Sequence, residues 1–325
     1  MYLFDELKQK LENKRIKIVF PEGHDIRVLS ACVDLHKDGY VDPIVVGNRE
    51  AVTKLISENQ FDVKGMTFID NEHYDDIESL VKLFVERRAG KISEYDARRL
   101  LLTNKNYFGT MLVYSGKADG LVSGADNSTG DTIRPGLQII KMKPSYKRTS
   151  GIFFLVKGEE RLLMADCGIN INPTAEDLAE TACITDTTAR QFGIDPKIAL
   201  LSFSTKGSAK SEETEKVIKA LEIAKEKYPD LCIDGELQFD AAYVPDVAKK
   251  KAPNSAVAGK ANAFIFPTLD SGNIGYKIAQ RLGGYEAVGP VLQGLNKPVN
   301  DLSRGCNQQD VYNLALITAV QAMED

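Results

Sequence analysis

The alternation of short apolar runs with longer helical patterns is the feature that most constrains what this chain can fold into. Runs rich in β-branched and other apolar residues predict strands at 15–20, 43–47, 120–124, 151–156, 162–166, 198–203 and 263–267. Patterns of helical period predict helices between them, at 25–37, 175–192, 211–227 and 271–282. Because strands that alternate with helices form largely parallel sheets covered by helices, the sequence predicts an α/β fold.

Length and composition indicate an ordinary globular protein with two domains. The chain has 325 residues, of which 43% are hydrophobic and 27% are charged. At about 100–200 residues per domain this length fits two domains, and the absence of a long linker predicts that they are closely joined. The net charge of −5 argues against a nucleic-acid-binding surface, which normally needs a basic face.

No segment of the sequence predicts export or a membrane span. Residues 1–15 have the pattern of an amphipathic charged helix and lack the apolar centre of a signal peptide. No run approaches the roughly eighteen apolar residues of a membrane helix. The five cysteines are odd in number and form no CxxC pair, which is typical of reduced thiols. We therefore expect a cytoplasmic protein that binds neither membrane nor nucleic acid.

Several common kinds of site are poorly supported by the sequence. The three histidines lack metal-ligand spacing, which also disfavours a Ser-His-Asp triad. Neither GxGxxG nor GxxxxGK(S/T) follows a predicted strand, which argues against nicotinamide and P-loop chemistry. The acids of segment 234–240 have oxygens that a metal would need, but their spacing favours solvated or salt-bridged side chains.

The segment 298–310 is the strongest candidate for a site. It places Ser303, Arg304, Cys306 and Asp310 in a short turn before the apolar run 311–323. Asn307 is a good N-cap, so the turn opens a helix whose N-terminus attracts anions. Arg304 adds a donor fork suited to phosphate, and Asp310 supplies a possible general base. The alternative is structural, because Asn307 and Asp310 also form an ordinary capping pair.

A second candidate follows the predicted strand at 120–124. Segment 123–135 is dense in hydroxyls, glycines and N–H donors, includes Ser128, Thr129 and Thr132, and ends near Arg134. Ligands of α/β sheets bind outside the carboxyl ends of strands, so this loop suits a small phosphate. The alternative is a connection that only caps the helix beginning near Thr132.

Three weaker signals are open to either interpretation. Segment 202–211 follows a strand, carries two lysines and opens a helix, so it fits either phosphate contact or helix capping. Lys260, before the strand at 263–267, either meets an anion or faces solvent. Arg88, at the end of an amphipathic helix, alone indicates no more than a favourable interaction with the helix dipole.

Taken together, these motifs resemble the phosphotransacetylase, or phosphate acetyltransferase, family over essentially the whole chain. The motifs that carry the resemblance are, in chain order, FPE at 20–22, VSG at 122–124, DTIRP at 131–135, LSFSTKGSAKS at 201–211, DGELQ at 234–238, AGKAN at 258–262, GNIGYKIAQRL at 272–282 and NDLSRGCNQQD at 300–310. Several of them are long and specific.

The resemblance implies an architecture. It implies two α/β/α domains with a cleft between them, similar to the isocitrate and isopropylmalate dehydrogenases. The first domain is expected to be discontinuous, with residues 1–147 and 298–325, and the second to be inserted as residues 148–297. Members of this short type are commonly homodimers, so the resemblance also implies a homodimer.

The resemblance further implies a reaction and its residues. The family transfers an acetyl group reversibly between CoA and phosphate, so the ligands implied are CoA, acetyl-CoA, phosphate and acetyl phosphate, with no metal or other cofactor. The catalytic residues implied are Asp310, Ser303 and Arg304, and the substrate-binding residues are Arg134, Arg88, Ser128, Thr129, Thr132 and Lys260. We expect Asp310 to deprotonate the CoA thiol and the thiolate to attack acetyl phosphate directly in a ternary complex. No histidine lies near Cys306 to activate it, so we expect no acetyl-cysteine intermediate.

Rival functions remain at this point. Phosphate butyryltransferase would perform the same chemistry on a longer acyl chain. A metal- and NAD(P)-dependent hydroxy-acid dehydrogenase of similar architecture would need a nicotinamide site and a carboxylate-bound metal. A sensor that binds acetyl phosphate or CoA without catalysis would not need the general base and both arginines.

Overall fold

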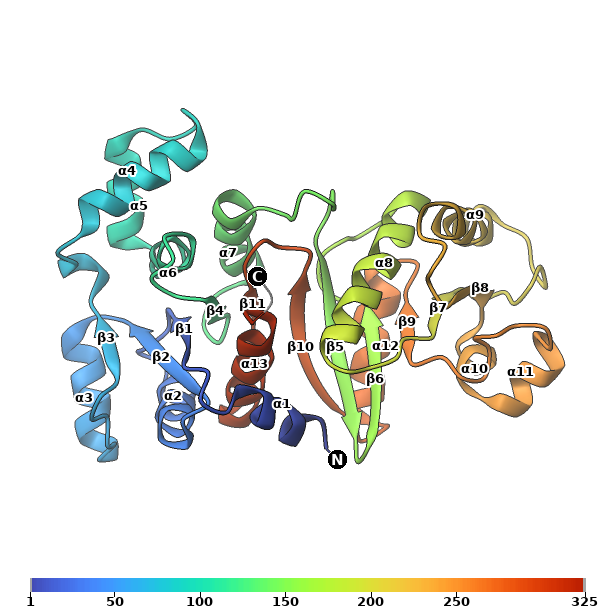
Figure 1. The fold of residues 1–325 in the computed structure, drawn as a ribbon, viewed down its shortest axis with the longest axis horizontal. Helices are drawn as coiled ribbons and strands as arrows, with labels where there is room; N and C mark the ends of the chain where they lie inside the picture. The colour runs from blue at the N-terminus through green and yellow to red at the C-terminus, as the bar shows by residue number, and fades with distance from the viewer. Residues whose placement is uncertain (1, 324–325) are drawn as a thin grey trace. The chain divides into compact units, whose positions relative to one another are not determined.

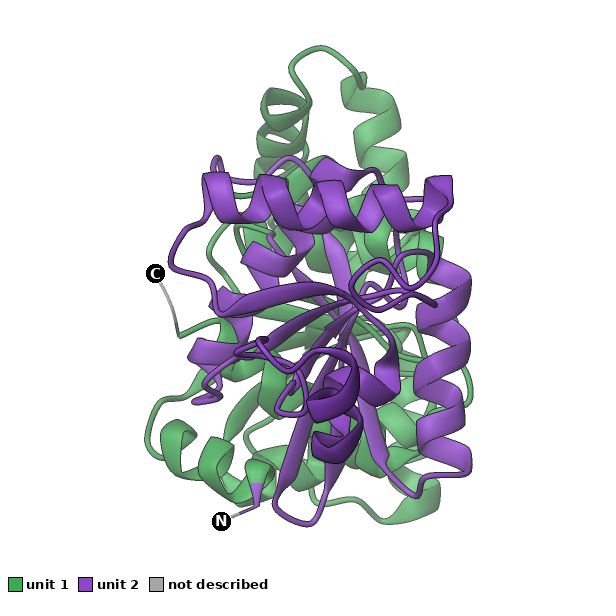
Figure 2. Cartoon of the chain, turned by 90° about the vertical axis from the view of Figure 1, so that its right-hand side faces the viewer, with its two compact units in different colours: residues 1, 3–143, 295–325 green, residues 2, 144–294 purple. Residues whose placement is uncertain are grey.

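The structure, a computed structural model, describes residues 2–323, which fold into two compact units (Figure 2). The first unit comprises residues 3–143 together with the C-terminal segment from residue 295, and the second comprises residues 144–294. These borders lie a few residues from those predicted at 147/148 and 297/298. None of the helices in the described residues combines the length and apolar character needed to span a bilayer.

The first unit is built on a five-stranded sheet with the order β11-β4-β1-β2-β3. The strands are β1 (Ile16–Phe20), β2 (Val41–Val46), β3 (Thr67–Ile69), β4 (Gly120–Ser123) and β11 (Val299–Asp301). All neighbouring strands pair in parallel. Because the strands run in one direction, the loops that follow them gather at a single edge of the sheet.

Helices cover both faces of this sheet. α13 (Gln308–Gln321, red in Figure 1) packs on β4 and β1, and α6 (Lys105–Tyr114) packs on the same strands. Side chains alternate between faces along a strand, and Gly120 faces α13 whereas Leu121 faces α6. Every residue of α13 from Val311 to Val320 is buried, as expected for a helix that is apolar on all sides.

The other helices of the first unit connect and surround these strands. They are α1 (Leu3–Leu11), α2 (Ile26–Asp38), α3 (Arg49–Asn59), α4 (Ile77–Arg88), α5 (Glu94–Thr103) and α7 (Thr129–Pro135), with short turns η1 (Asn71–His73) and η2 (Gly136–Ile140). α1 and α2 both pack against α13, so the first helices and the last described helix share one core.

The second unit contains a six-stranded sheet with the order β10-β5-β6-β9-β7-β8. Its strands are β5 (Ser150–Lys157), β6 (Glu160–Ala165), β7 (Ile198–Leu201), β8 (Ile233–Leu237), β9 (Ala263–Ile265) and β10 (Glu286–Gln293). Its helices are α8 (Ala175–Gln191), α9 (Glu212–Lys227), α10 (Phe239–Tyr243), α11 (Pro245–Lys251) and α12 (Leu269–Arg281). β5 runs antiparallel to both β6 and β10, so the sheet is mixed rather than wholly parallel.

Candidate functional site

Three loops converge at the carboxyl edge of the first sheet. They follow β1, β4 and β11, which are adjacent in the strand order. The loop after β4 and the turn after β11 carry two of the sequence-predicted groups, 123–135 and 303–310. The sheet topology therefore brings together segments that lie about 170 residues apart in the sequence.

Glu22, just after β1, fixes the loop that follows β4. Its carboxylate accepts hydrogen bonds from the backbone N–H groups of Gly124 and Ala125, both at 2.9 Å, and of Asp126 and Asn127, at 2.8 and 3.0 Å. The Asn127 side chain donates a further bond at 2.7 Å. Glu22 is 1% exposed. A buried carboxylate with this many donors holds the loop in one conformation.

Arg27 connects the same loop to the turn after β11. Its guanidinium donates to the backbone oxygens of Arg304 and Cys306, both at 2.9 Å, and of Ala125, at 2.8 Å. Asp25 holds the guanidinium from the other side at 2.6 Å, and this hydrogen bond raises the pKa of Arg27. The two candidate segments are therefore tied together by one side chain.

Asn106 of α6 adds a third link. Its side-chain oxygen accepts from the Ser123 hydroxyl at 2.8 Å, and its amide donates to the Asp131 carbonyl at 3.2 Å. Asn106 is buried and thereby joins the end of β4 to α7.

The turn after β11 has the predicted capping geometry. Asn307 caps α13, and the Asp310 Oδ2 accepts the Asn307 N–H at 2.9 Å, so the structural interpretation of this pair is real. The Asp310 Oδ1 accepts no hydrogen bond from a described residue. Ser303 and Arg304 are exposed, and Asp310 is half-buried. Capping thus occupies one oxygen of Asp310 and leaves the other available for chemistry.

Cys306 in this turn is poorly suited to be a nucleophile. It is 6% exposed, and burial raises the pKa of its thiol to about 11, although the nearby charge of Arg27 opposes this shift. The thiolate is the reactive form of cysteine, so a buried thiol of this kind is largely unreactive near neutral pH.

α7 presents some of its predicted residues to solvent and buries another. Ser128 caps the helix by accepting the Asp131 N–H, and Thr129 and Arg134 are exposed. The Arg134 guanidinium lies 3.8 Å from the Asp131 carboxylate, which is a loose ion pair. Thr132, in contrast, is fully buried, so its hydroxyl lies in the interior rather than at the surface expected of a phosphate contact.

Arg88 and Arg134 both act electrostatically on Tyr107, although the sequence motif of Arg88 is weak. Arg88 is the last residue of α4 and is partly exposed. Burial raises the pKa of Tyr107, and the charges of Arg134 and Arg88 both oppose that shift. The preceding Arg87 has a structural role instead, because it donates to the Ile139 and Ile140 carbonyls.

Asp301, the last residue of β11, is a feature that sequence reasoning missed. It is 1% exposed, and neither of its carboxyl oxygens has a hydrogen-bond partner of ordinary geometry among the described residues. The Thr132 hydroxyl beside it is also without a partner. Burial raises the pKa of Asp301 to about 7. Glu22 and Asp301 lie within the motifs at 20–22 and 300–310, but the motifs alone assigned them no role. Arg27 lies within the predicted helix at 25–37, and no predicted element adjoins Asn106.

The second unit holds the remaining predicted residues. Lys260 is exposed in the turn before β9, at the amino end of that strand and thus opposite the loops that follow β6, β7 and β8. In segment 202–211, Ser211 caps α9 and Lys206 forms an ion pair with Asp234 at 2.6 Å. Asp240 pairs with Lys251 at 3.0 Å. Asp234 and Asp240 are thus salt-bridged, which is one of the two predicted states of the acids in 234–240, whereas Glu236 accepts hydrogen bonds from the Ser204 hydroxyl and the Gly207 N–H.

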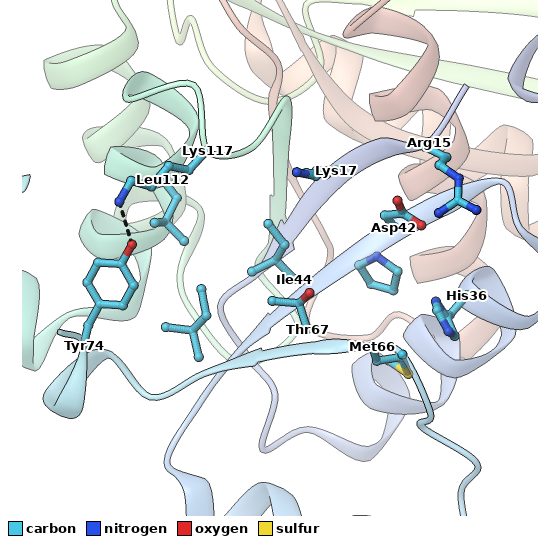
Figure 3. Close-up of a pocket in the computed structure, with 13 residues that line it drawn as sticks. Arg15, Lys17, His36, Asp42, Ile44, Met66, Thr67, Tyr74, Leu112 and Lys117 are labelled. Atoms are coloured by element: carbon cyan, nitrogen blue, oxygen red, sulfur yellow. Dashed lines mark hydrogen bonds between the residues drawn. The ribbon is translucent and has the colours of Figure 1, made fainter. Parts of the chain in front are cut away.

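A cavity of about 310 Å³ lies at the opposite, amino-terminal edge of the first sheet (Figure 3). The Lys117 ammonium group bonds to the Tyr74 hydroxyl on one side, and Arg15, Asp42 and His36 lie on the other. At this cavity Lys117 forms an ion pair with Asp76, the Asp119 carboxylate accepts the backbone N–H of Lys17, and Asp42 lies beside Arg15. This balance of charge makes it a weaker candidate for an anion site than the carboxyl edge.

Comparison with known proteins assigns a family. The family model described as "Phosphate acetyl/butaryl transferase" matches residues 2–319. The phosphate acetyltransferase of Bacillus subtilis (strain 168) is 59% identical over 321 residues, which cover 99% of each chain.

Solved structures agree with this assignment. A phosphotransacetylase from Streptococcus pyogenes is 55% identical with a TM-score of 0.95, covering 99% of this chain and 98% of that one. The EutD phosphotransacetylase from Staphylococcus aureus is 56% identical with a TM-score of 0.92, covering 98% of each chain.

A more distant likeness concerns the fold alone. A 4-hydroxythreonine-4-phosphate dehydrogenase from Klebsiella pneumoniae is 12% identical, with a TM-score of 0.58 over 94% of this chain. The predicted likeness to a dehydrogenase architecture therefore extends to a solved dehydrogenase. Since the family model spans nearly the whole sequence and the relatives match along their full length, the chain belongs to the phosphate acetyl/butaryl transferase family.

Proposed function

We propose that this protein transfers an acetyl group reversibly between CoA and inorganic phosphate. The observation that carries the proposal is the joining of the Ser303–Asp310 turn to the Arg134 helix region by Glu22, Arg27 and Asn106. Family membership supplies the reaction class, and the relatives named above are phosphate acetyltransferases.

The proposed chemistry is direct acyl transfer in a ternary complex. Asp310 takes the proton of the CoA thiol through its free Oδ1. The sulfur then forms a bond to the carbonyl carbon of acetyl phosphate, and the carbon–oxygen bond to the phosphoryl group breaks. A free thiol has a pKa of about 8.5 and is mostly protonated at neutral pH, so a positioned base accelerates this step.

The exposed cations would hold the phosphoryl group. Arg304 lies in the first turn before α13, where helix N–H groups also favour an anion. Arg134 and Arg88 supply further positive charge near Tyr107. Donors aimed at charge that develops on the leaving phosphate would stabilise the transition state, while Ser303 would orient the thiolate.

The remaining features of the proposal concern ligands and assembly. The ligands are CoA, acetyl-CoA, phosphate and acetyl phosphate, with no metal or separate cofactor. Ser128 and Thr129 are secondary phosphate contacts, and Lys260 is a candidate contact of the second unit. We further propose a cytoplasmic homodimer.

One comparative assay tests the proposal. The protein is given acetyl phosphate and CoA, butyryl phosphate and CoA, or isocitrate with NADP and a divalent metal. We expect the acetyl substrate to be used with the highest kcat/KM, and initial-rate plots for its two substrates to intersect. Preference for butyryl phosphate, or reduction of NADP, would replace the proposed reaction with a rival.

A further inference from the structure

The environment of Asp301 differs from that of an ordinary buried acid. A Cβ atom on Gly124 would lie 2.3 Å from the Asp301 Oδ1, so this position excludes side chains and the backbone of the β4 loop closes directly over the carboxyl group. Thr129 and Thr132 of α7 approach it without forming hydrogen bonds of full geometry. Asp301 therefore lies enclosed between the β4 loop and α7.

No positive charge in residues 2–323 compensates Asp301. Among the elements that pack on β11, β4 carries no ionisable residue, α7 carries Asp131 and Arg134, and the charged residue of α13 is Asp310. The charge that acts on Asp301 is that of Glu22, which is also negative. No group of three or more potential metal ligands occurs among the described residues. A bare carboxylate in such a place is costly, whereas a neutral acid is not.

We infer that Asp301 works as an uncharged carboxylic acid that pairs with the Thr132 hydroxyl and positions α7 against the turn that carries Ser303 and Arg304. The two groups complement each other, because an acid and a hydroxyl each offer one donor and an acceptor. Asp301 lies two residues before Ser303, and Thr132 lies two residues before Arg134. The pair thus joins α7 to the turn after β11, whereas Arg27 joins that turn to the β4 loop.

The consequence of ionisation follows from the same geometry. Above its pKa of about 7, Asp301 would place a negative charge directly behind the segments that we assign to phosphate. Binding of an anionic substrate would then weaken as the pH rises. Asp301 is in this view a positioning residue and does not touch the substrate.

Thermal unfolding as a function of pH tests the inference without reference to activity. The folded-state pKa lies above the ordinary value of 3.8, so the folded state binds the proton more tightly. Stability of the wild type is consequently lost as pH rises from about 4 to about 7, and it then levels off. Asp301→Asn mimics the neutral acid and escapes this loss. We expect its Tm to exceed that of the wild type at pH 8 by on the order of 5 °C, with a smaller difference at pH 5.

A matched control comes from the second unit. Asp166 is similarly buried, but it accepts backbone hydrogen bonds from Gly151, Gly168, Ile169 and Asn170. Asp166→Asn places an amide NH₂ against these donors and should lower the Tm at both pH values. If Asp301→Asn lowers the Tm at pH 8 in the same way, Asp301 acts as an anion and the inference is wrong.

The principal alternative is that a bound cation, rather than a proton, neutralises Asp301. This alternative predicts that the Tm depends on the cation present. Wild type and Asp301→Asn are unfolded at pH 8 in potassium chloride and in tetramethylammonium chloride of equal ionic strength. Equal Tm values for the wild type in the two salts support a proton. A Tm raised by potassium in the wild type but not in the variant would overturn the inference.

The Thr132 hydroxyl is tested by a conservative pair. Thr132→Val keeps the shape and removes the hydroxyl, so it should lower the Tm, whereas Thr132→Ser should stay close to the wild type. Equal Tm values for the two variants would remove the hydroxyl from the pair.

A kinetic measurement as a function of pH is a further test, and it rests on the proposed function. Between pH 6 and pH 8.5 the KM of the wild type for acetyl phosphate should rise severalfold, while that of Asp301→Asn should stay nearly constant with kcat within about threefold of the wild type. A hundredfold loss of kcat in the variant at every pH would instead make Asp301 a catalytic anion. If the wild type transfers no acetyl group at all, the proposed function fails, and the unfolding measurements still decide the state of Asp301.

Discussion

Two buried acids, Glu22 in the first unit and Asp166 in the second, have the same kind of hydrogen-bonded environment. Each lies just after a strand and accepts four backbone N–H bonds, and each also accepts from an asparagine side chain, Asn127 or Asn170. In the second unit the other buried acids also have donors: Asp234 has Lys206 and Glu236 has Ser204. Asp301 of the first unit has none.

This difference distinguishes buried acids that stabilise the fold from a buried acid for which we infer a role in function. A buried acid with a full set of donors stabilises a loop, and its hydrogen bonds leave little reason to invoke chemistry. A buried acid without donors is tolerated only where something else requires it, and functional sites are where such departures concentrate. Asp301 is such an acid among the described residues. It lies in the same unit as Ser303, Arg304 and Asp310.

The largest effect is expected at Asp310. Asp310→Asn retains the shape of the cap but removes the base, so kcat should fall roughly 100- to 10,000-fold while CoA binding persists. Steady-state kinetics and calorimetric titration with CoA measure the two quantities. Turnover above about a tenth of the wild-type value would leave Asp310 with only its capping role.

Removal of the exposed cations should have the next largest effect. Arg134→Ala and Arg304→Ala each lose charge-assisted hydrogen bonds worth about 1.5–3 kcal/mol, which corresponds to roughly 10- to 150-fold in kcat/KM for acetyl phosphate. The Kd for CoA should change less. Lys206→Ala serves as a control, because this lysine already pairs with Asp234 in the second unit. Unchanged kinetics in both arginine variants would place phosphate elsewhere.

The two fully satisfied acids provide a paired test of the comparison itself. Glu22→Gln and Asp166→Asn each turn one acceptor oxygen into a donor and should each destabilise by about 1–3 kcal/mol. Only Glu22→Gln should also lower kcat, because it releases the loop that leads into α7. Chemical denaturation and kinetics on both variants decide the point, and an equal loss of kcat in both would contradict the assignment of the chemistry to the first unit.

The smallest effect is expected at Cys306. Its thiol is buried and has a pKa raised to about 11, so Cys306→Ala should keep substantial activity. Initial-rate plots for the wild type should intersect, as a ternary complex requires. Parallel plots together with a labelled acetyl group trapped on Cys306 would establish a covalent mechanism instead.

The sequence predicted those strands whose apolar runs are continuous. The runs at 15–20, 43–47 and 120–124 became β1, β2 and β4. It missed β3, β8, β10 and β11. Of these, Val299–Asp301 and Ile233–Leu237 include acids that only long-range contacts explain. It also missed the antiparallel arrangement of β5 and β6, which depends on the tight turn at Gly158, where φ is 63°.

The site was predictable to the extent that its residues are contiguous. Ser303, Arg304 and Asp310 form a local motif whose capping geometry can be inferred from the chain itself. Glu22 and Arg27 act on partners about 100 to 280 residues away, and no local pattern records such partners. Thr132 lies in a polar segment typical of a surface loop, but its side chain is buried, because the helical period of α7 directs it toward the interior.

The return of the chain to the first unit has a consequence for how the protein is made. β11 forms an edge of the first sheet and α13 fills its core, yet both are synthesised after all of residues 144–294. On the ribosome the second unit can therefore reach its native state while the first still lacks a strand and a helix that is buried from Val311 to Val320. The same late segment carries Ser303, Arg304 and Asp310, so a nascent chain has no complete proposed site until its first unit is able to fold. Synthesis order thus makes folding of the first unit a precondition of activity.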